Sequence, residues 1–288
     1  MVLCALSNFT LLSSAQQVKK GYANINGASI YYEIKGEGTP IIFLHGFACD
    51  TRTWDYQFDV FAKDYKAIRY DFRGFGKSSL PDTINPYSHI KDLTALLEFL
   101  ELDNVIIVAH SMGGKDALEF TFNNPDRVDA LIFAEGAASI RGFNNQPGSK
   151  EVGMMFEKVF SAEGPEEGKD VLMQIDVFKS ALTNPKSEKI FRQMVMDYSG
   201  WSWEGHKNLK EKYKPIKFED LSNIQIPVLL INGELSHDHY HQTMQKMHDN
   251  LPNSKLVVLK NAGHMLGLEN PEQFNQKVLS FFNEKDIK

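Results

Sequence analysis

The feature that most constrains this chain is a run of six residues from Ala109 to Gly114, with the sequence AHSMGG. The apolar residues 105–108 before it are typical of a buried strand, and residues 115–120 after it are typical of the start of a helix. A serine on so sharp a turn needs small flanking residues, because the strand and helix backbones nearly touch. The pattern is G-x-S-x-G with alanine in the first small position, and it predicts that the Ser111 hydroxyl is a nucleophile.

Composition allows one large domain and disfavours several classes of partner. The chain has 288 residues, 42% of them hydrophobic and 24% charged, which is ordinary for a globular α/β domain with an insertion. Its net charge is −6 without a basic block, so we expect no nucleic-acid partner. Because it has no apolar run of about eighteen residues, we also expect no membrane-spanning helix.

The first 17 residues resemble a secretion signal in part. Residues 2–12 are mostly apolar, and Ser13-Ser14-Ala15 is similar to a signal-peptidase site, but the usual basic start is missing. The localisation is therefore left open between export and the cytoplasm. The chain has two cysteines, Cys4 and Cys49, and Cys4 lies in this segment, so we predict no structural disulfide.

From residue 19 onward, strand and helix patterns alternate, which predicts a largely parallel α/β sheet. The chain opens with an expected hairpin that turns at Asn26-Gly27. The other expected strands are 40–44, 65–70, 105–108, 130–134, 227–232 and 255–259, and the expected helices are 54–61, 86–100, 240–250 and 271–282, besides the one that follows Ser111.

The alternation stops at about residue 139 and resumes with the strand expected at 227–232, and the helical segment up to about residue 221 is too long for a loop in a compact domain. We interpret 139–221 as a helical cap inserted into a core made of 18–138 and 222–288. Apolar side chains in the cap predict a small-molecule substrate with an apolar moiety. They are Met154, Met155, Phe156, Phe160, Met173, Phe178, Phe191, Met194, Met196, Trp201 and Trp203.

Seven short motifs in order carry a family resemblance. They are GEGTP at 36–40, HGF at 45–47, DFRGFGKS at 71–78, AHSMGG at 109–114, IPVLLING at 226–233, NAGH at 261–264 and ENPE at 269–272. Beyond residue 21 the chain thus resembles the α/β-hydrolase fold superfamily. The resemblance implies a mostly parallel, eight-stranded-type sheet with helices on both faces, an inserted helical cap, and an esterase-like serine hydrolase.

The resemblance also assigns roles to particular residues. A serine needs a base within hydrogen-bond reach, and the family's position for that base falls on His264. The developing oxyanion needs two donors, and the family's backbone N–H donors fall on Phe47 and Met112.

The acid that should orient His264 is left with two candidates. The family's usual position is occupied by Ser236, which carries no charge. Glu135 follows the strand after the nucleophile strand, at a position that some members use, and Asp238 lies two residues beyond Ser236. We favour Glu135 and keep Asp238 as the alternative.

The sequence thus predicts a serine hydrolase of a small carboxylic ester, acting through an acyl-enzyme. Hydrolysis of an amide, lactone, thioester or carbon–carbon bond remains an alternative, and so does a non-catalytic ligand-binding protein. We expect no cofactor and no metal, since the histidines of 237–241 are typical of a solvated loop and helix start. The sequence leaves the oligomeric state open.

Overall fold

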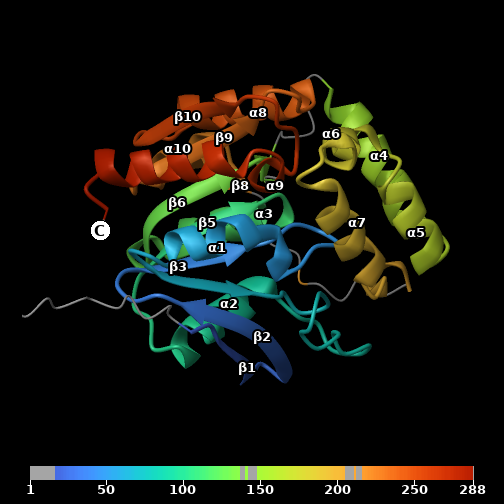
Figure 1. Ribbon diagram of the computed structural model, residues 1–288, viewed down its shortest axis with the longest axis horizontal. Helices are drawn as coiled ribbons and strands as arrows, with labels where there is room; N and C mark the ends of the chain where they lie inside the picture. The colour runs from blue at the N-terminus through green and yellow to red at the C-terminus, as the bar shows by residue number, and fades with distance from the viewer. Residues whose placement is uncertain (1–16, 137–139, 142–147, 205–210, 212–215, 288) are drawn as a thin grey trace, which may run out of the picture.

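The computed structural model describes residues 17–136, 140–141, 148–204, 211 and 216–287 (Figure 1). The signal-like segment, apart from residue 17, and Cys4 lie outside these residues, as do parts of the segment expected to form the cap.

An eight-stranded sheet forms the centre of the molecule, with the strand order β1-β2-β4-β3-β5-β6-β9-β10. The first two pairings are antiparallel and all the others are parallel, which confirms the predicted fold class. The strands are β1 (Lys19–Ile25), β2 (Ala28–Lys35), β3 (Pro40–Leu44), β4 (Lys66–Tyr70), β5 (Val105–His110), β6 (Val128–Ala134), β9 (Val228–Gly233) and β10 (Ser254–Leu259).

The opening hairpin turns where the sequence predicts it. Ile25 pairs with Ala28, which leaves Asn26 and Gly27 as a two-residue turn. Both have positive φ, 47° and 71°, as a type I′ turn requires.

Helices cover both faces of the sheet because the central strands are apolar on both sides. Ile41 and Phe43 of β3 pack on one face with α1 (Asp55–Phe61) and α10 (Pro271–Glu284), which lie in front of the sheet in Figure 1. The opposite face packs against three helices. These are α2 (His89–Phe99), α3 (Met112–Asn123) and α8 (Asp238–Asn250).

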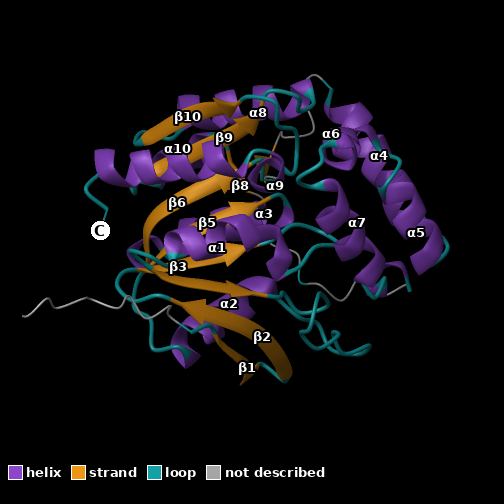
Figure 2. Cartoon of the chain, in the orientation of Figure 1, coloured by secondary structure: helices purple, strands orange, loops and turns teal. Residues whose placement is uncertain are grey.

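A group of helices lies beyond the carboxyl ends of the parallel strands, where the arrows in Figure 2 point. It comprises α4 (Ser149–Phe160), α5 (Pro165–Leu172), α6 (Lys179–Thr183) and α7 (Glu188–Asp197), with short 3-10 turns at Asp176–Phe178 and Trp201–Trp203. An ion pair of 2.8 Å between Arg52 and Asp197 connects α7 to the turn η1 (Thr51–Trp54). The strands β7 (Ile140–Arg141) and β8 (Ile216–Lys217) pair where the chain enters and leaves this group.

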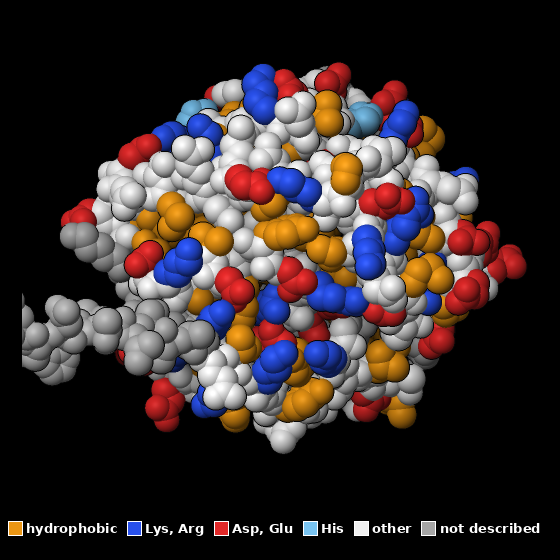
Figure 3. Space-filling view, viewed as in Figure 1, with side chains coloured by type: hydrophobic (Ala, Val, Ile, Leu, Met, Phe, Trp, Pro, Cys, Tyr) orange, Lys and Arg blue, Asp and Glu red, His pale blue; other side chains and the backbone are white. Residues whose placement is uncertain are grey.

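The surface carries both signs of charge. On the face in Figure 3, Lys and Arg side chains are interspersed with Asp and Glu side chains. Within the described ranges, no helix is both long enough and apolar enough to cross a bilayer.

A substitution in the turn between β5 and α3 can test why small residues surround Ser111. A Cβ at Gly113 would lie 2.6 Å from the His45 carbonyl oxygen and 2.7 Å from that of Leu44. We therefore expect Gly113→Ala to lower the free energy of unfolding by about 1–3 kcal/mol, measured by urea denaturation.

Gly153→Ala is the matched control, because Gly153 lies within α4 and a Cβ there meets nothing within 4 Å. It should raise the free energy of unfolding by about 0.5–1 kcal/mol. Equal effects at the two positions would contradict the close-packing explanation.

Candidate active site

Ser111 occupies the turn between β5 and α3 in a strained conformation. Its φ of 51° and ψ of −117° are rare for a residue with a side chain, and such strain clusters at functional sites. The turn lifts the hydroxyl away from the sheet, although the residue is only 9% exposed. Met112 follows as the first residue of α3, where a backbone N–H has no acceptor within the helix.

His264 reaches Ser111 from the loop between β10 and α9 (Leu266–Glu269). Its Nε2 lies 2.9 Å from the Ser111 Oγ, so the structure brings together two residues that are 153 positions apart. The imidazole packs between the rings of Phe178 and Tyr240, with centroids 5.4 and 4.9 Å away. These rings limit the orientations that the imidazole can adopt.

Glu135 contacts the other nitrogen of the same ring. Its Oε2 lies 3.0 Å from His264 Nδ1, and the Glu135 residue is fully buried. A carboxylate can only accept, so Nδ1 carries the proton and donates it to Oε2. Nε2 is then the acceptor for the Ser111 O–H, which is the protonation state that a base acting on this serine requires.

The loop that follows β9 supplies donors to the second oxygen of Glu135. The backbone N–H of Gly233 donates to Oε1 at 2.6 Å, and the Ser236 hydroxyl donates to it as well. With its amide nitrogen turned toward Glu135, Asn232 donates to Oε1 at 2.7 Å. Ser236, at the family's usual acid position, therefore contacts the carboxylate.

Asp238 is placed differently. It is the first residue of α8 and its side chain is exposed. Both nitrogens of His264 are already bonded, one to Ser111 and one to Glu135. The geometry thus brings Glu135 to the imidazole and leaves no ring nitrogen for Asp238.

Phe47 lies on the loop after β3, which passes directly over the Ser111 turn. A Cβ at Gly46 would lie 3.2 Å from the Ser111 Cβ, so the backbone that enters Phe47 is close to Ser111. Gly113 N–H donates to the His45 carbonyl at 3.1 Å and fixes this loop to α3. The segment carrying Phe47 is therefore held beside the start of α3, where Met112 lies.

Inside that loop, His45 is fully buried and fixes the backbone through both ring nitrogens. Its Nε2 accepts from Phe72 N–H at 3.0 Å, and its Nδ1 lies 2.8 Å from the Gly46 carbonyl. Burial lowers the pKa of His45 to about 4, so the ring is neutral at pH 7 and can accept at Nε2.

Glu269 holds the backbone on both sides of His264, a role that sequence reasoning missed. Its carboxylate accepts from Gly263 N–H at 2.8 Å and from Met265 N–H at 2.9 Å. The hydroxyl of Ser180, in α6, donates to the same carboxylate. The sequence does place an acid five residues after His264, but the motif at 269–272 indicated only the family and gave no role to this residue.

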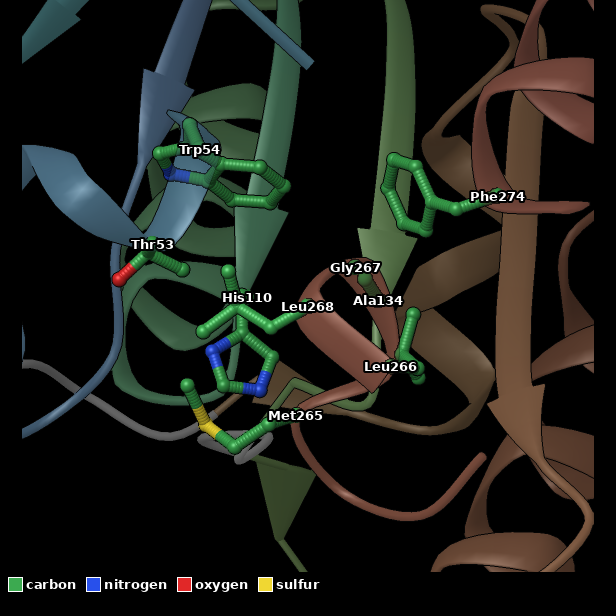
Figure 4. A pocket seen from close by; sticks show the side chains of 9 residues that line it. All are labelled: Thr53, Trp54, His110, Ala134, Met265, Leu266, Gly267, Leu268 and Phe274. Atoms are coloured by element: carbon green, nitrogen blue, oxygen red, sulfur yellow. The ribbon is translucent and has the colours of Figure 1, made fainter. Parts of the chain in front are cut away.

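His110 ties the Ser111 turn to the His264 loop. Its Nε2 lies 2.8 Å from the His264 carbonyl oxygen, which identifies Nε2 as the donor. Burial, the largest cause, lowers the pKa of this ring well below its usual value. The ring faces a cavity of about 10 Å³ among Thr53, Met265 and Leu268, which has room for about one water molecule (Figure 4).

A larger cavity of about 390 Å³ opens beside Phe47 and Met112. Its wall is mainly aromatic and combines residues of the core with residues of the helical layer. The aromatic rings are Phe47, Phe75, Tyr87, Phe160, Tyr198 and Trp201. Of the eleven apolar cap residues expected to form a pocket, Phe160 and Trp201 line it; Phe191 and Met194 are buried elsewhere, and Met154 is 61% exposed.

Within the parts of the chain that the structure describes, no group of three or more His, Cys, Asp or Glu side chains is arranged to hold a metal ion. The histidines of 237–241 serve local structure, since His237 caps α8 and His241 lies beside Asn232.

Comparison with known proteins identifies the family. The family model described as alpha/beta hydrolase fold matches residues 39–271, which is most of the chain. The chain belongs to the α/β-hydrolase fold family. This confirms the resemblance inferred from the seven motifs.

Among curated α/β-hydrolase relatives, the AB hydrolase superfamily protein YisY of Bacillus subtilis is 26% identical over 88% of this chain and 96% of its own length. Two solved structures share the fold. An esterase from Exiguobacterium antarcticum has a TM-score of 0.75 at 24% identity, covering 92% of this chain and 100% of its own. The enol-lactonase of Burkholderia xenovorans LB400 has a TM-score of 0.74 at 20% identity, covering 91% and 99%. The family and its named members support hydrolase activity for this chain.

The neutral ring of His45 predicts an acid-sensitive fold. Its pKa is lowered from an ordinary 6.5 to about 4, so the unfolded chain binds the proton more readily and stability falls as the pH drops through this interval. Between pH 7.5 and 5, this ring alone should cost about 2 kcal/mol of unfolding free energy. In urea denaturation at the two pH values, His45→Gln should lose about 2 kcal/mol less than the wild type; equal losses would contradict the assignment.

The hydrogen bonds from Gly263 N–H and Met265 N–H to Glu269 form a clamp on the His264 backbone, and this clamp predicts an effect on the rate of reaction at Ser111. In Glu269→Gln, an amide group replaces one acceptor, so one backbone N–H beside His264 loses its partner. The rate of Ser111 labelling by a fluorophosphonate should fall about 10- to 100-fold, because small misplacements of a base have large effects. Near-UV circular dichroism and the KM of any ester that is turned over should change little.

Glu272→Gln is the control, since Glu272 lies three residues further along the chain and pairs on the surface with Lys186. It should label at the wild-type rate. Equal labelling rates for wild type and Glu269→Gln would show that the clamp does not position His264.

Proposed function

We propose that this protein is a serine hydrolase that acts on a small carboxylic ester through an acyl-enzyme. The observation that carries the proposal is the continuous series of contacts from Ser111 Oγ through His264 to Glu135, at 2.9 and 3.0 Å. These are the three roles that activation of a serine requires: nucleophile, base and orienting acid.

In the first half of the reaction, the Ser111 Oγ attacks the ester carbonyl carbon and its proton passes to His264 Nε2. Glu135 stabilises the imidazolium that forms, while the N–H groups of Phe47 and Met112 bind the oxyanion. When the tetrahedral intermediate collapses, the carbon–oxygen bond to the leaving group breaks. His264 then donates its proton to the departing alkoxide, and the alcohol leaves.

In the second half, water attacks the acyl carbon and gives a proton to His264. The bond to Ser111 breaks, the serine oxygen recovers the proton, and the carboxylic acid leaves. No further reactant is needed, because each proton taken up by His264 is returned.

The proposal includes the domain division expected from the sequence. A core of 18–138 and 222–288 carries Ser111, His264 and Glu135, and the insertion 139–221 acts as a cap over the site. The position of α4 to α7 beyond the carboxyl ends of the strands supports this division (Figure 1). So does the presence of Phe160 and Trp201 in the wall of the large cavity, which suits an apolar substrate.

Two alternatives differ in what they require. A non-catalytic binding protein was suggested by the uncharged Ser236, but Glu135 provides a carboxylate at the imidazole from another strand. Hydrolysis of an amide, lactone, thioester or carbon–carbon bond uses the same residues and is separated only by substrates.

Fluorophosphonate labelling and ester turnover test the proposal together. We expect Ser111→Ala to abolish both, and Glu135→Gln to lower kcat by about 10⁴-fold, because the amide fails to hold the imidazole in its productive tautomer. Asp238→Asn is the control and should keep the wild-type kcat. Absence of labelling in the wild type would refute the nucleophile, and loss of turnover in Asp238→Asn alone would refute the choice of acid.

The bond type follows from a panel of p-nitrophenyl esters, lactones and aminoacyl anilides measured at the same enzyme concentration. The proposal expects the highest kcat/KM on the esters. A higher value on anilides or lactones would assign the enzyme to that bond instead.

A further inference from the structure

The cavity of about 390 Å³ is large enough to hold a ring-bearing group. It falls within the range typical of small-molecule sites and is more than twice the volume of an engineered cavity of about 150 Å³ that binds benzene. Its rings already meet in the geometry that aromatic groups prefer. Phe47 contacts Phe160 at 5.1 Å with the planes at 70°, and Tyr87 contacts Trp201 at 5.6 Å with the planes at 79°.

The cavity opens beside the proposed oxyanion donors rather than beside His264. The leaving group has to face His264, because that ring protonates it. Neither His264 nor its ring neighbours Phe178 and Tyr240 line the cavity, whereas Phe47 and Met112 do. A group in the cavity therefore lies beside the proposed oxyanion donors and belongs to the acyl half of the ester.

Several polar groups in the wall are already engaged by the protein. The Tyr198 hydroxyl lies 2.8 Å from the Ser202 Oγ and accepts from Ser202 N–H at 3.2 Å. His89 has Nδ1 3.0 Å from the Asp116 carboxylate and Nε2 3.1 Å from the Arg73 carbonyl. The wall therefore offers an acyl group mainly ring faces and edges.

The described lining also disfavours a cationic guest, although aromatic cages can bind cations. Both nitrogens of His89 face oxygens of the protein, those of the Asp116 carboxylate and the Arg73 carbonyl, and Asp116 is not among the lining residues. In the described part of the lining, no carboxylate faces the cavity to balance a bound positive charge.

We infer that this cavity selects a neutral aromatic acyl group, so that the preferred substrates are arylalkanoyl esters such as arylacetates. The inference rests on the proposed ester hydrolysis, and it concerns only what the acyl pocket recognises. An aryl group can make a ring–ring interaction with the wall that a saturated six-membered ring cannot make, and this interaction is worth about two- to twelve-fold in kcat/KM.

The test compares p-nitrophenyl phenylacetate with p-nitrophenyl cyclohexylacetate. The leaving group is the same, and both acyl groups carry a six-membered ring on a CH2 group, aromatic in one and saturated in the other. After each rate is divided by that of hydroxide-catalysed hydrolysis, we expect kcat/KM to favour phenylacetate by about two- to twelve-fold. A ratio of one or below would overturn the inference.

Two wall variants and a control assign the preference to this cavity. Trp201→Leu and Tyr87→Leu should each lower the phenylacetate-to-cyclohexylacetate ratio by about two-fold or more. Phe99→Leu should leave the ratio unchanged, because Phe99 is 48% exposed and contacts Tyr32 instead. An unchanged ratio in both folded wall variants would overturn the inference.

Binding to the Ser111→Ala protein separates this inference from the proposed function, because it needs no turnover. Calorimetry should show that methyl phenylacetate binds more tightly than methyl cyclohexylacetate. It should also show that the neutral ester methyl 3,3-dimethylbutanoate binds more tightly than its cationic isostere, methyl trimethylammonioacetate. The opposite order in either pair would overturn the inference. Failure of fluorophosphonate labelling in the wild type would instead refute Ser111 as the nucleophile. The binding result would still decide whether the cavity prefers a neutral aromatic group.

Discussion

The carboxylate of Glu135 is the group on which the geometry of the site depends. It is fully buried, and a buried charge is costly unless every oxygen is satisfied. One oxygen accepts from His264, and the other accepts from Gly233 and Ser236. Because these donors come from separate segments, the same charge fixes the imidazole and the loop after β9.

Much of the architecture was readable from local patterns. The central strands are apolar on both faces and short, and the hairpin carries an Asn-Gly turn, so the type of these elements and their succession along the chain follow from periodicity and turn chemistry. The Ser111 turn was predictable for a steric reason, since Gly113 has no room for a side chain. Helix starts were less well defined: α2 begins at His89 because Ser88 caps it, three residues after the expected start.

The site was only partly predictable, because its contacts join residues far apart in the chain. Ser111 and His264 follow from motifs, yet the choice between Glu135 and Asp238 depends on which carboxylate the fold brings to the imidazole. The clamp by Glu269 and the core half of the aromatic wall, with Phe75 and Tyr87, are likewise products of tertiary structure. Phe75 and Tyr87 precede the cap segment in the sequence by more than 50 residues, so the cap residues do not indicate that half of the wall.

The placement of Glu135 directly after β6 has a consequence for which part of the chain carries the charge. Glu135 directly follows a strand hydrogen-bonded on both sides, to β5 and to β9, and its own N–H donates to the Ile231 carbonyl. The negative charge is thus anchored at the end of a central strand that is paired on both sides. The segment between β9 and α8 contributes an uncharged donor, the Ser236 hydroxyl, so the negative charge beside His264 is not carried by this surface segment.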